Sequence, residues 1–440
     1  MDLGVPRPVR AVIVAGGLGT RMGELSRTLP KPLLPFGGRP LLAHQVELVA
    51  RAGLSEVTLL TGHLSEEIER RLSELAPPGV SLRAAVEPRP SGSGGCLRFA
   101  GREDSTLLVL FGDVLLDMDL AALVRFHQSS GGIATAVVHP NDHPRDSDLV
   151  ELGPGDRITA LHRKPHPSGL LVRNQVTAGV FVLEPELVRA IPEDRPADLV
   201  HHVLAPAVER GEPVFGYRTA EYLKDVGTPE RYRAVTEDWE RGLVAALHRS
   251  NPRPAAFLDR DGTLNVPNGY IARPEDLRLL PGAAQAVRLL NRARVRAIVV
   301  TNQPVLARGE CDERTLERIH ARLEMELGAE GAFLDGLYYC PHHPDRGFPG
   351  EVPALKIDCA CRKPGTGLLE QALRDFAIDL PRSALFGDTL RDAETARRMG
   401  LPAWLVGWTG PLPPGARPAP DLLRAVEEWL DQAQVAASSP

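Results

Sequence analysis

Two aspartates lie two positions apart in the C-terminal half of the chain, directly after a short apolar run. They occur in the segment Phe257-Leu258-Asp259-Arg260-Asp261-Gly262-Thr263-Leu264. In such a pair the first carboxylate can act as a nucleophile, and the second can donate and accept a proton. Acidic pairs also occur in loops that only cap helices. The catalytic interpretation is favoured because Thr301-Asn302-Gln303, Arg362-Lys363-Pro364 and Gly387-Asp388 follow further along the chain.

A second group of residues has the chemistry of a metal site. Three of the five cysteines lie close together in the sequence, next to a pair of histidines. In a reducing compartment such clustering indicates a metal rather than disulfides. Three thiolates and one imidazole suit a closed tetrahedral Zn²⁺ site, and the alternative is ordinary buried cysteines beside surface histidines. The expected ligands are Cys340, His342, Cys359 and Cys361, with His343 left over.

The N-terminal half carries a glycine-rich loop followed by a basic segment. Ala15-Gly16-Gly17-Leu18-Gly19-Thr20-Arg21 comes after an apolar run, and Pro30-Lys31-Pro32 follows it. Glycines let backbone N–H groups approach a triphosphate, and the two cations, Arg21 and Lys31, would balance its charge. The order of residues is neither that of a P-loop nor that of a dinucleotide-binding turn. The alternative is an ordinary tight turn.

The elements that position these residues are strands that alternate with helices, which favours mostly parallel sheets covered on both faces. The pattern begins at residue 9 and restarts at Ala255, so we expect a domain boundary near residue 252 and one helix over Glu230–His248. Strands are expected at Val9–Val14, Val57–Leu60, Leu107–Leu110, Ile133–Val138, Gly179–Leu183, Ala255–Leu258, Arg296–Val300 and Ala384–Phe386, and helices at Leu41–Ala52 and Leu120–His127.

Composition narrows the class of protein. The 440 residues are 43% hydrophobic and 25% charged, with a net charge of −6. A mildly acidic balance argues against a nucleic-acid partner, and no apolar run approaches the roughly 20 residues of a membrane span. The first ten residues lack the features of a signal peptide, so we expect a cytoplasmic protein acting on small molecules, with homo-oligomerisation left open.

The N-terminal half resembles the sugar nucleotidyltransferase family over roughly the first 235 residues, through the GGxGTR loop, the PKPL segment, Thr177-Ala178-Gly179-Val180 and Asp225-Val226-Gly227. The resemblance implies that Asp113 and Asp225 hold Mg²⁺ and that Arg21 and Lys31 stabilise the triphosphate. Arg163 stands where the family often has glutamate, which puts the usual sugar contact in doubt. The nucleotide-binding residues it implies are Ala15, Gly16, Gly17, Gly19, Thr20, Arg21, Lys31, Glu87, Gly94 and Gly95.

The C-terminal half resembles the haloacid dehalogenase superfamily over about residues 254–425. The resemblance implies that Asp259 is the nucleophile, Asp261 the general acid and base, and that Thr301 and Lys363 bind the phosphoryl group. Mg²⁺ would be held by Asp259, Asp388 and the backbone carbonyl of Asp261, while Asp392 either supports the metal or caps a helix. The substrate-binding residues it implies are Asn268, Gly269, Tyr270, Asn302, Gln303, Arg308 and Arg362.

Within the superfamily, the cysteine cluster resembles the heptose-1,7-bisphosphate 7-phosphatases, with histidinol-phosphate phosphatases as relatives. Pro304-Val305 departs from their usual Ser-Gly. Removing the distal phosphate of a heptose bisphosphate leaves a sugar 1-phosphate, which a nucleotidyltransferase consumes. Resemblance to heptose-1-phosphate guanylyltransferases then implies GTP as donor, the α-anomer as substrate and GDP-heptose as product. The alternatives are another hexose 1-phosphate joined to a histidinol-phosphate-type phosphatase, or one half that is a non-catalytic binding module.

These resemblances imply an α/β protein with two Rossmann-like domains. The first would be a GT-A-like nucleotidyltransferase domain with a mixed sheet, and the second a haloacid dehalogenase-like domain with a parallel sheet and a zinc-bound loop. The expected ranges are 1–235 for the nucleotidyltransferase, 236–253 for a helical linker, 254–430 for the phosphatase and 431–440 for a flexible tail.

Overall fold

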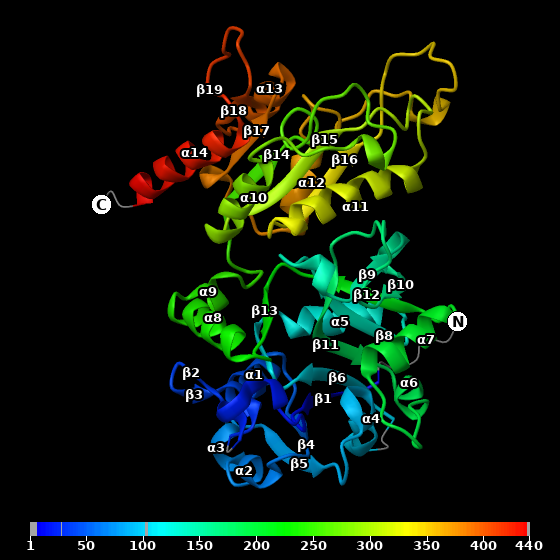
Figure 1. The fold of residues 1–440 in the computed structure, drawn as a ribbon, viewed down its shortest axis with the longest axis vertical. Helices are drawn as coiled ribbons and strands as arrows, with labels where there is room; N and C mark the ends of the chain where they lie inside the picture. The colour runs from blue at the N-terminus through cyan, green and yellow to red at the C-terminus, as the bar shows by residue number, and fades with distance from the viewer. Residues whose placement is uncertain (1–6, 28, 102–103, 438–440) are drawn as a thin grey trace. The chain divides into compact units, whose positions relative to one another are not determined.

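The computed structural model describes residues 7–27, 29–101 and 104–437. The chain divides into two compact units that change over between Arg249 and Ser250 (Figure 1). The first unit contains Met1–His139, Val150–Arg163 and Val176–Arg249. The second contains Ser250–Pro440 together with two earlier segments, Pro140–Leu149 and Lys164–Gln175. Each unit has its own sheet and its own hydrophobic core.

The first unit is built on a mixed, nine-stranded sheet. β1 lies at its centre, parallel to both β4 and β6, while β11 runs antiparallel to β6 and β8. The β-branched and leucine-rich strands of the centre are fully buried, as expected where helices cover both faces. The strands are β1 Val9–Val14, β4 Glu56–Thr61, β5 Ser81–Val86, β6 Thr106–Phe111, β8 Ala134–His139, β9 Leu149–Leu152, β10 Ile158–His162, β11 Val176–Leu183 and β12 Val214–Arg218.

Helices cover both faces of this sheet. One face is covered by α1 (Leu41–Arg51), α2 (Ser65–Glu69), α3 (Leu72–Leu75) and α5 (Leu120–Ser130). The other is covered by the segment after α4 (Gly92–Gly95), by α6 (Pro185–Arg189), by a π-helical turn at Leu199–Leu204 and by α7 (Ala205–Glu209). The layered arrangement confirms the predicted α/β class and the mixed sheet.

Two small two-stranded sheets complete the unit. β2 (Pro35–Phe36) pairs with β3 (Arg39–Pro40), and β7 (Val114–Asp117) pairs antiparallel with β13 (Tyr222–Asp225). The single helix expected over Glu230–His248 is wrong, because the structure has α8 (Pro229–Glu240) and α9 (Leu243–Ala246). Gly242 separates them with a φ of 68°, a left-handed conformation that ends a helix and that glycine adopts without strain.

The second unit contains a fully parallel, six-stranded sheet in the order β16-β15-β14-β17-β18-β19. Helices α10, α11 and α14 pack on one face, and α12 and α13 on the other. Helix α14 runs past residue 430, where a flexible tail was expected, to Ala437. The bounds are β14 Ala255–Leu258, β15 Arg296–Asn302, β16 Gly336–Cys340, β17 Ala384–Gly387, β18 Ala403–Val406, β19 Ala416–Ala419, α10 Ala283–Arg292, α11 Glu313–Ala329, α12 Gly367–Asp375, α13 Leu390–Arg398 and α14 Leu422–Ala437.

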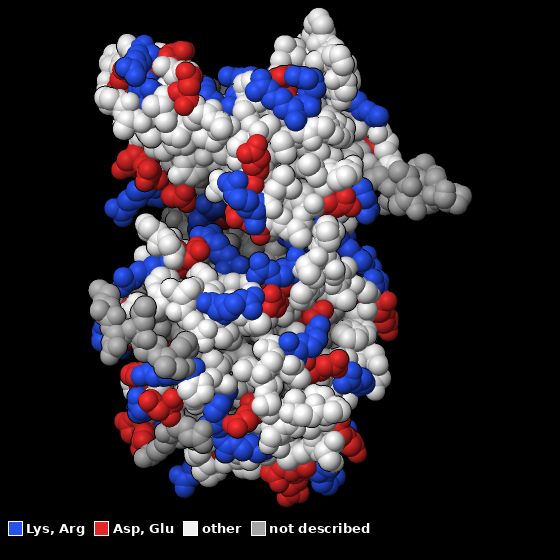
Figure 2. Space-filling model, turned by 180° about the vertical axis from the view of Figure 1, so that it is seen from behind, with Lys and Arg blue, Asp and Glu red and all other residues white. Residues whose placement is uncertain are grey.

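The surface carries charges of both signs. Figure 2 shows Lys and Arg side chains interspersed with Asp and Glu on the face that it displays. This distribution agrees with the small net charge of −6. Among the described residues, no helix has both the length and the apolar character that a bilayer span requires.

Candidate active sites

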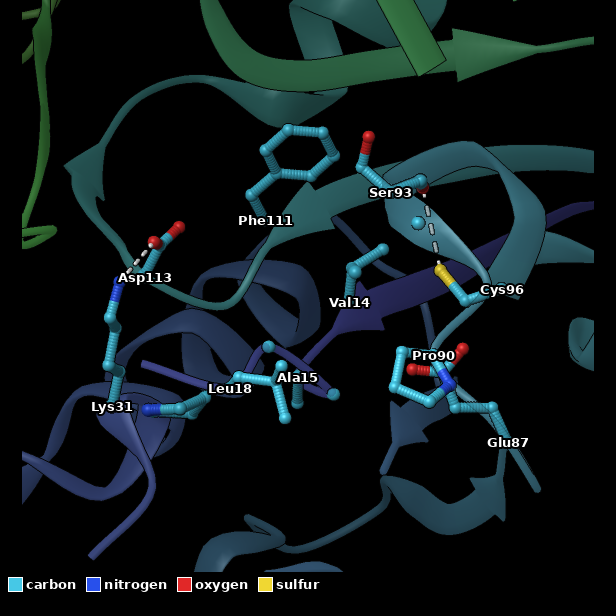
Figure 3. Close-up of a pocket in the computed structure, with 14 residues that line it drawn as sticks. Val14, Ala15, Leu18, Lys31, Glu87, Pro90, Ser93, Cys96, Phe111 and Asp113 are labelled. Carbon is cyan, nitrogen blue, oxygen red and sulfur yellow. Dashed lines mark hydrogen bonds and ion pairs between the residues drawn. The ribbon is translucent and has the colours of Figure 1, made fainter. Parts of the chain in front are cut away.

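The first candidate site lies where β1 and β6 end side by side. The two strands are parallel and in register, with Val14 opposite Phe111, and Gly112 N–H donates to the Val14 carbonyl at 2.9 Å. This register places the glycine-rich loop after β1 beside Asp113 after β6. A pocket opens there, and Figure 3 shows Lys31 and Asp113 at one side and Glu87 at the other.

The two predicted magnesium aspartates are brought together by the small β7–β13 sheet. Asp225 pairs with Val114 across the strands, and Val226 N–H donates to the Asp113 carbonyl at 2.8 Å. Each carboxylate lies beside a cation: Lys31 Nζ is 3.3 Å from Asp113, and Arg231 is 2.6 Å from Asp225. Two neighbouring carboxylates, both partly exposed, are the hard oxygen donors that Mg²⁺ uses when phosphates complete its coordination. The residues therefore fit the predicted ion.

The glycine-rich loop approaches the pocket as predicted for a nucleotide site. Ala15, Gly16 and Gly17 line the pocket together with Lys31 and Glu87. A Cβ on Gly16 would lie 2.8 Å from Glu87 Oε1 and 3.2 Å from Gly62 N, so a larger residue would displace the Glu87 side chain. Glu87 in turn accepts hydrogen bonds from the backbone N–H and the hydroxyl of Ser91, at 3.1 and 2.6 Å. Glu87 thus holds the next loop in place.

The rest of the predicted nucleotide set is distributed around this pocket. Gly19 has a φ of +65° and packs against Ser26, and Thr20 and Arg21 begin the 3₁₀ segment Thr20–Ser26. The Arg21 guanidinium lies beside the Asp225 turn, since Nη2 would be 3.3 Å from a Cβ at Gly227. Arg21 therefore lies beside the turn that follows Asp225, and it is not among the residues that line the pocket.

Gly94 and Gly95 are turned away from the pocket. Their N–H groups donate to the Ala197 carbonyl at 2.8 and 3.0 Å, and both residues are buried. The pocket is instead lined by Gly92 and Ser93 from the same segment. A run of four small residues does not reveal which of its N–H groups will be used internally. The further lining residues that sequence reasoning missed are Val14, Leu18, Pro32, Pro90, Cys96 and Phe111.

Lys164, the neighbour of the unusual Arg163, connects two segments of the second unit. Arg163 is exposed, and Lys164 contacts Asp146, with Nζ 2.6 Å from the carbonyl oxygen and 3.2 Å from Oδ1. Lys164 N–H also donates to Asp148 at 3.0 Å. These bonds join the segments 140–149 and 164–175 of the second unit to each other.

The second candidate site is formed at the ends of β14, β15 and β17. Asp259 follows β14, Asp388 follows β17, and Asp259 N–H donates to the Phe386 carbonyl at 2.8 Å. The Lys363 ammonium lies between two carboxylates, 2.9 Å from Asp259 and 2.5 Å from Asp392, and its side chain is only 3% exposed. The parallel sheet has thus gathered the predicted nucleophile, the cation and the metal aspartate at one edge, as the strand endings required.

The electrostatics of this group favour a bound cation. One carboxylate oxygen from each of Asp259, Asp388 and Asp392 lies within 4.8 Å of the others. Burial raises the pKa of Asp259, although Lys363 opposes this effect. Burial, together with the charge of Asp392, also raises the pKa of Asp388 to about 6. Crowded carboxylates whose charged forms are disfavoured gain most from a divalent ion, so these residues fit Mg²⁺.

Asp392 caps a helix, one of the two roles considered for it from the sequence, and it also contacts Lys363. Its Oδ2 accepts from the N–H and hydroxyl of Thr389, at 3.1 and 2.6 Å, in a capping box at the start of α13. Its Oδ1 accepts from Lys363. The cap and the site therefore share one buried carboxylate.

Asp261 points away from this carboxylate group and is held by three donors. Arg260 forms a forked pair with it at 2.9–3.1 Å, and Asn265 and Gln303 each donate at 2.9 Å. Burial raises the pKa of Asp261, but Arg260 and the two amides outweigh it, so that the net shift is downward. Sequence reasoning missed Arg260, although a charged residue between two strand-end aspartates was the available signal.

The residues after β15 join the residues that are predicted to bind phosphate. Gln303 donates to both Asp261 and Thr301, each at 2.9 Å. Asn302 and Lys363 exchange two hydrogen bonds through the Asn302 side chain and the Lys363 backbone, at 2.9 and 3.1 Å. Asn302 and Gln303, predicted as substrate residues, therefore position Lys363, Thr301 and Asp261.

The predicted substrate loop lies at the surface of the second unit. Asn268 and Gly269 are exposed, and Tyr270 is 48% exposed. The Arg308 guanidinium lies over two rings, 4.6 Å from the centre of Tyr270 and 4.1 Å from that of Phe348. Pro304, which has no N–H to offer, accepts from Arg308 N–H through its carbonyl at 2.9 Å.

The four predicted zinc ligands converge. The Sγ atoms of Cys340, Cys359 and Cys361 lie 3.2–3.5 Å apart, and His342 Nδ1 is 3.3 Å from Cys361 Sγ. A tetrahedron with Zn–S bonds of about 2.3 Å has edges of about 3.8 Å, so a small expansion accommodates the ion. His343 Nδ1 instead accepts from Asp345 N–H at 3.2 Å. Arg362 donates to the His342 carbonyl at 3.0 Å, which fixes the loop before Lys363.

Comparison with known proteins finds relatives of both halves of the chain. Residues 10–242 match the nucleotidyl transferase family, and residues 360–412 match the HAD-hydrolase-like family. The chain is 38% identical over 152 residues to a D-glycero-beta-D-manno-heptose-1,7-bisphosphate 7-phosphatase from Rhodopseudomonas palustris, covering 34% of this chain and 82% of that protein. It is 32% identical over 239 residues to a mannose-1-phosphate guanylyltransferase from Mycobacterium tuberculosis, covering 54% of this chain and 66% of that protein.

A solved structure shares the C-terminal part. A D,D-heptose 1,7-bisphosphate phosphatase from B. bronchiseptica, complexed with magnesium and phosphate, is 34% identical, with a TM-score of 0.36. The comparison covers 41% of this chain and 99% of that one. Because the family match over residues 10–242 spans more than half of the chain, the protein belongs to the nucleotidyl transferase family, and its C-terminal part is a HAD-like phosphatase.

Proposed function

We propose that this protein removes the C7 phosphate of D-glycero-D-manno-heptose 1,7-bisphosphate and then transfers a guanylyl group from GTP to the heptose 1-phosphate. The products are GDP-heptose, pyrophosphate and inorganic phosphate. The observation that carries the proposal is that one chain combines a part related to a heptose-bisphosphate phosphatase with a part related to a mannose-1-phosphate guanylyltransferase. The product of the first reaction is the substrate class of the second.

In the phosphatase reaction, a carboxylate oxygen of Asp259 attacks the C7 phosphorus and the bond to the sugar oxygen breaks. Asp261 delivers a proton to the departing sugar oxygen and later accepts one from the water that hydrolyses the aspartyl-phosphate. The buried Lys363 ammonium, beside Asp259, offsets the charge on the transferring phosphoryl group. Mg²⁺ held by Asp259 and Asp388 would supply further charge neutralisation.

In the nucleotidyl transfer, the 1-phosphate oxygen of the sugar attacks the α-phosphorus of GTP and pyrophosphate leaves. The chain's own contribution is to bind and orient, since no protein nucleophile is required. Gly16 and Gly17 line the pocket, where their backbone N–H groups would bind phosphate oxygens, while Lys31 and Arg21 would neutralise the phosphates. Mg²⁺ held by Asp113 and Asp225 would neutralise the phosphates further.

The proposed location is the cytoplasm, where nucleoside triphosphates and these sugar phosphates occur together.

Zn²⁺ is proposed to be structural. Cys340, His342, Cys359 and Cys361 form a complete set of four donors, so the ion needs no water ligand. Its effect would be to hold the loop that ends in Lys363. The phosphatase site is therefore expected to depend on zinc for its shape and on magnesium for its chemistry.

The test is to incubate the purified protein with Mg²⁺, GTP and either anomer of heptose 1,7-bisphosphate. Phosphate, pyrophosphate and GDP-heptose should all form, and the other nucleoside triphosphates should react at least about tenfold more slowly. The Asp259→Asn variant should convert heptose 1-phosphate but not the bisphosphate. If histidinol phosphate is hydrolysed faster than either bisphosphate, the proposed substrate is wrong.

A further inference from the structure

The loop that carries the predicted zinc ligands, residues 340–361, also places an aromatic ring next to two cations. The ring of Phe348, which is half-buried, has its centre 4.1 Å from the Arg308 guanidinium and 4.7 Å from the Lys356 ammonium. The His343 ring stands nearly perpendicular to it, at 85°, with ring centres 6.1 Å apart. A cation within about 6 Å of a ring centre is attracted to the ring face. Phe348 is therefore the common contact of one arginine and one lysine.

The position of Phe348 is fixed by its own loop. The Glu351 carboxylate accepts from the N–H groups of Gly347 and Phe348, at 3.0 and 3.1 Å. The same carboxylate oxygen lies 3.4 Å from Lys356 Nζ, and the Lys356 side chain is only 1% exposed. Among the described residues, Lys356 Nζ forms no hydrogen bond. The buried ammonium thus interacts with one carboxylate and one ring, and both belong to the turn that presents Phe348.

This loop packs against the loop that follows β15. Val352 N–H donates to the Ala307 carbonyl at 3.0 Å. A Cβ placed on Gly309, whose φ is +69°, would lie 1.9 Å from the Gly350 carbonyl oxygen, so a larger residue would force the two loops apart. Ala307 and Gly309 are the neighbours of Arg308 in the chain. Arg308 is therefore held where the two loops meet.

The protein leaves hydrogen-bond donors of Arg308 unused. Its Nε donates to Glu310 at 2.6 Å, and no hydrogen bond from Nη1 or Nη2 is found among the described residues. The Tyr270 ring, which comes from the loop after β14, also contacts the guanidinium, 4.6 Å from its centre. The Arg308 side chain is 22% exposed, so an external group can reach it. A guanidinium with free Nη donors suits a phosphate, which accepts two parallel hydrogen bonds.

Arg308 follows the strand end that forms the candidate phosphatase site. β15 ends at Asn302, and the next residue, Gln303, donates to Asp261 at 2.9 Å. Arg308 N–H then donates to the Pro304 carbonyl at 2.9 Å, which closes one helical turn. With a rise of about 1.5 Å per residue, such a turn places the Arg308 backbone about 8 Å beyond Gln303. One sugar unit can span a distance of that size.

We propose that Phe348 is a positioning residue that holds Arg308 for a second phosphate group of the phosphatase substrate, the one that is not removed. Glu351 and Lys356 fix the ring, and the ring fixes the guanidinium. The proposal rests on the proposed phosphatase function, for which the retained group is the 1-phosphate. It assigns the preference for a bisphosphate over a monophosphate to a ring at position 348.

The experiment compares Phe348→Leu and Phe348→Tyr with a matched control, Phe376→Leu, all in the full-length protein. Phe376 has a cation–π contact of its own, 4.6 Å from the Arg296 guanidinium, but Arg296 begins β15 and the phosphatase site lies at the other end of that strand. Phosphate release is measured with heptose 1,7-bisphosphate and with p-nitrophenyl phosphate, which has no second phosphate. Bound zinc and thermal unfolding are recorded for every variant.

Phe348→Leu should raise KM for the bisphosphate about tenfold and leave kcat within about twofold, because a misplaced Arg308 weakens binding of a group that does not react. Both constants for p-nitrophenyl phosphate should change less than about twofold. Phe348→Tyr, which keeps the ring, should retain the wild-type KM, and so should Phe376→Leu. Bound zinc should be the same in all of the variants.

A KM for the bisphosphate that Phe348→Leu leaves within about twofold of the wild type overturns the proposal. Equal losses on the two substrates also overturn it, because they would show that the variant damages the catalytic groups. A loss that follows bound zinc or the melting temperature has the same consequence, since it would reflect an unfolded loop.

The proposed function is tested separately by the wild-type protein. If the wild type releases no phosphate from the heptose bisphosphate, the proposed substrate is wrong, and fructose 1,6-bisphosphate and fructose 6-phosphate then serve as the pair of probes. A wild-type preference for the bisphosphate that Phe348→Leu removes still supports the positioning role. The same preference in wild type and variant, or none in either, refutes it.

Discussion

Replacing Lys363 by methionine should destabilise the second unit and abolish phosphatase activity. Its ammonium is 3% exposed and lies 2.9 Å from Asp259 and 2.5 Å from Asp392. Removing one partner of a buried ion pair leaves an uncompensated charge, which costs roughly 3–5 kcal/mol. Asp392 keeps its two hydrogen bonds from Thr389, and the raised pKa of Asp259 lets that carboxylate take up a proton instead. We therefore expect the free energy of unfolding to fall by about 3 kcal/mol, at the lower end of this range.

The assay is urea unfolding followed by tryptophan fluorescence in metal-free buffer. Trp404, Trp408 and Trp429 lie in the second unit and only Trp239 in the first, so the signal reports mainly on the unit that is changed. With a urea m-value of about 2 kcal/mol/M, a loss of about 3 kcal/mol lowers the midpoint by about 1.5 M. Excess Mg²⁺ should restore part of this loss, because the ion supplies the missing positive charge.

Two further variants make the result specific. Lys356→Met removes another buried lysine, 2% exposed, whose carboxylate neighbour Glu351 is 3.4 Å away and outside the site, and it should cost less. Lys363→Met combined with Asp392→Asn should recover stability without recovering activity. A midpoint for Lys363→Met that equals that of the wild type in metal-free buffer would refute the electrostatic reasoning.

Four other outcomes follow from the structure. Cys359→Ser should lower bound zinc, measured by mass spectrometry, and abolish phosphate release while GTP-dependent pyrophosphate formation continues, because the zinc loop carries only the phosphatase cation. The pKa of His320 is lowered to about 4, so between pH 6.5 and 4 the unfolded chain binds a proton that the folded chain does not. The free energy of unfolding of the wild type should therefore fall by about 1.4 kcal/mol per pH unit as the pH falls through this window. His320→Gln should remove that slope in urea titrations at pH 7, 6, 5 and 4. Gly262→Ala should lower phosphatase kcat at least about tenfold, because the alanine Cβ would lie 2.1 Å from Asp388 Oδ2 and because residue 262 has a φ of +82°, which favours glycine. A normal rate with normal Mg²⁺ dependence would contradict the predicted ion site. Asp225→Asn should reduce nucleotidyl transfer by about 100-fold and leave phosphate release unchanged, and equal losses in both assays would show instead that the variant misfolds.

Much of the architecture could be predicted from local sequence patterns. Buried strands such as Val9–Val14 and Ala255–Leu258 are continuous apolar runs. The residues that follow such a strand lie at the edge of the sheet, because the strand ends there. The convergence of the four predicted zinc ligands could also be predicted, because the members of each pair are separated by a single residue and only the two pairs had to meet. The helix break at Gly242 was missed, since a lone glycine in a helical pattern is also tolerated within a helix.

The choice between neighbouring residues of one type could not be made from the sequence. Gly92 and Ser93 line the pocket, whereas the N–H groups of Gly94 and Gly95 donate to the Ala197 carbonyl. All four residues are small. The difference arises because a segment a hundred positions away supplies a carbonyl acceptor to two of them.

The sequence by itself determined the two reaction types, since nucleophile, cations and metal carboxylates follow strands or lie in short motifs whose spacing places them together. Only the tertiary structure decided which groups surround the predicted site residues. Arg260 pairs with Asp261 and Asp392 accepts from Lys363, and each is a single polar residue. Their roles come from burial, because a charged group removed from water must find its partner wherever the fold brings one, and that partner has no fixed spacing in the chain.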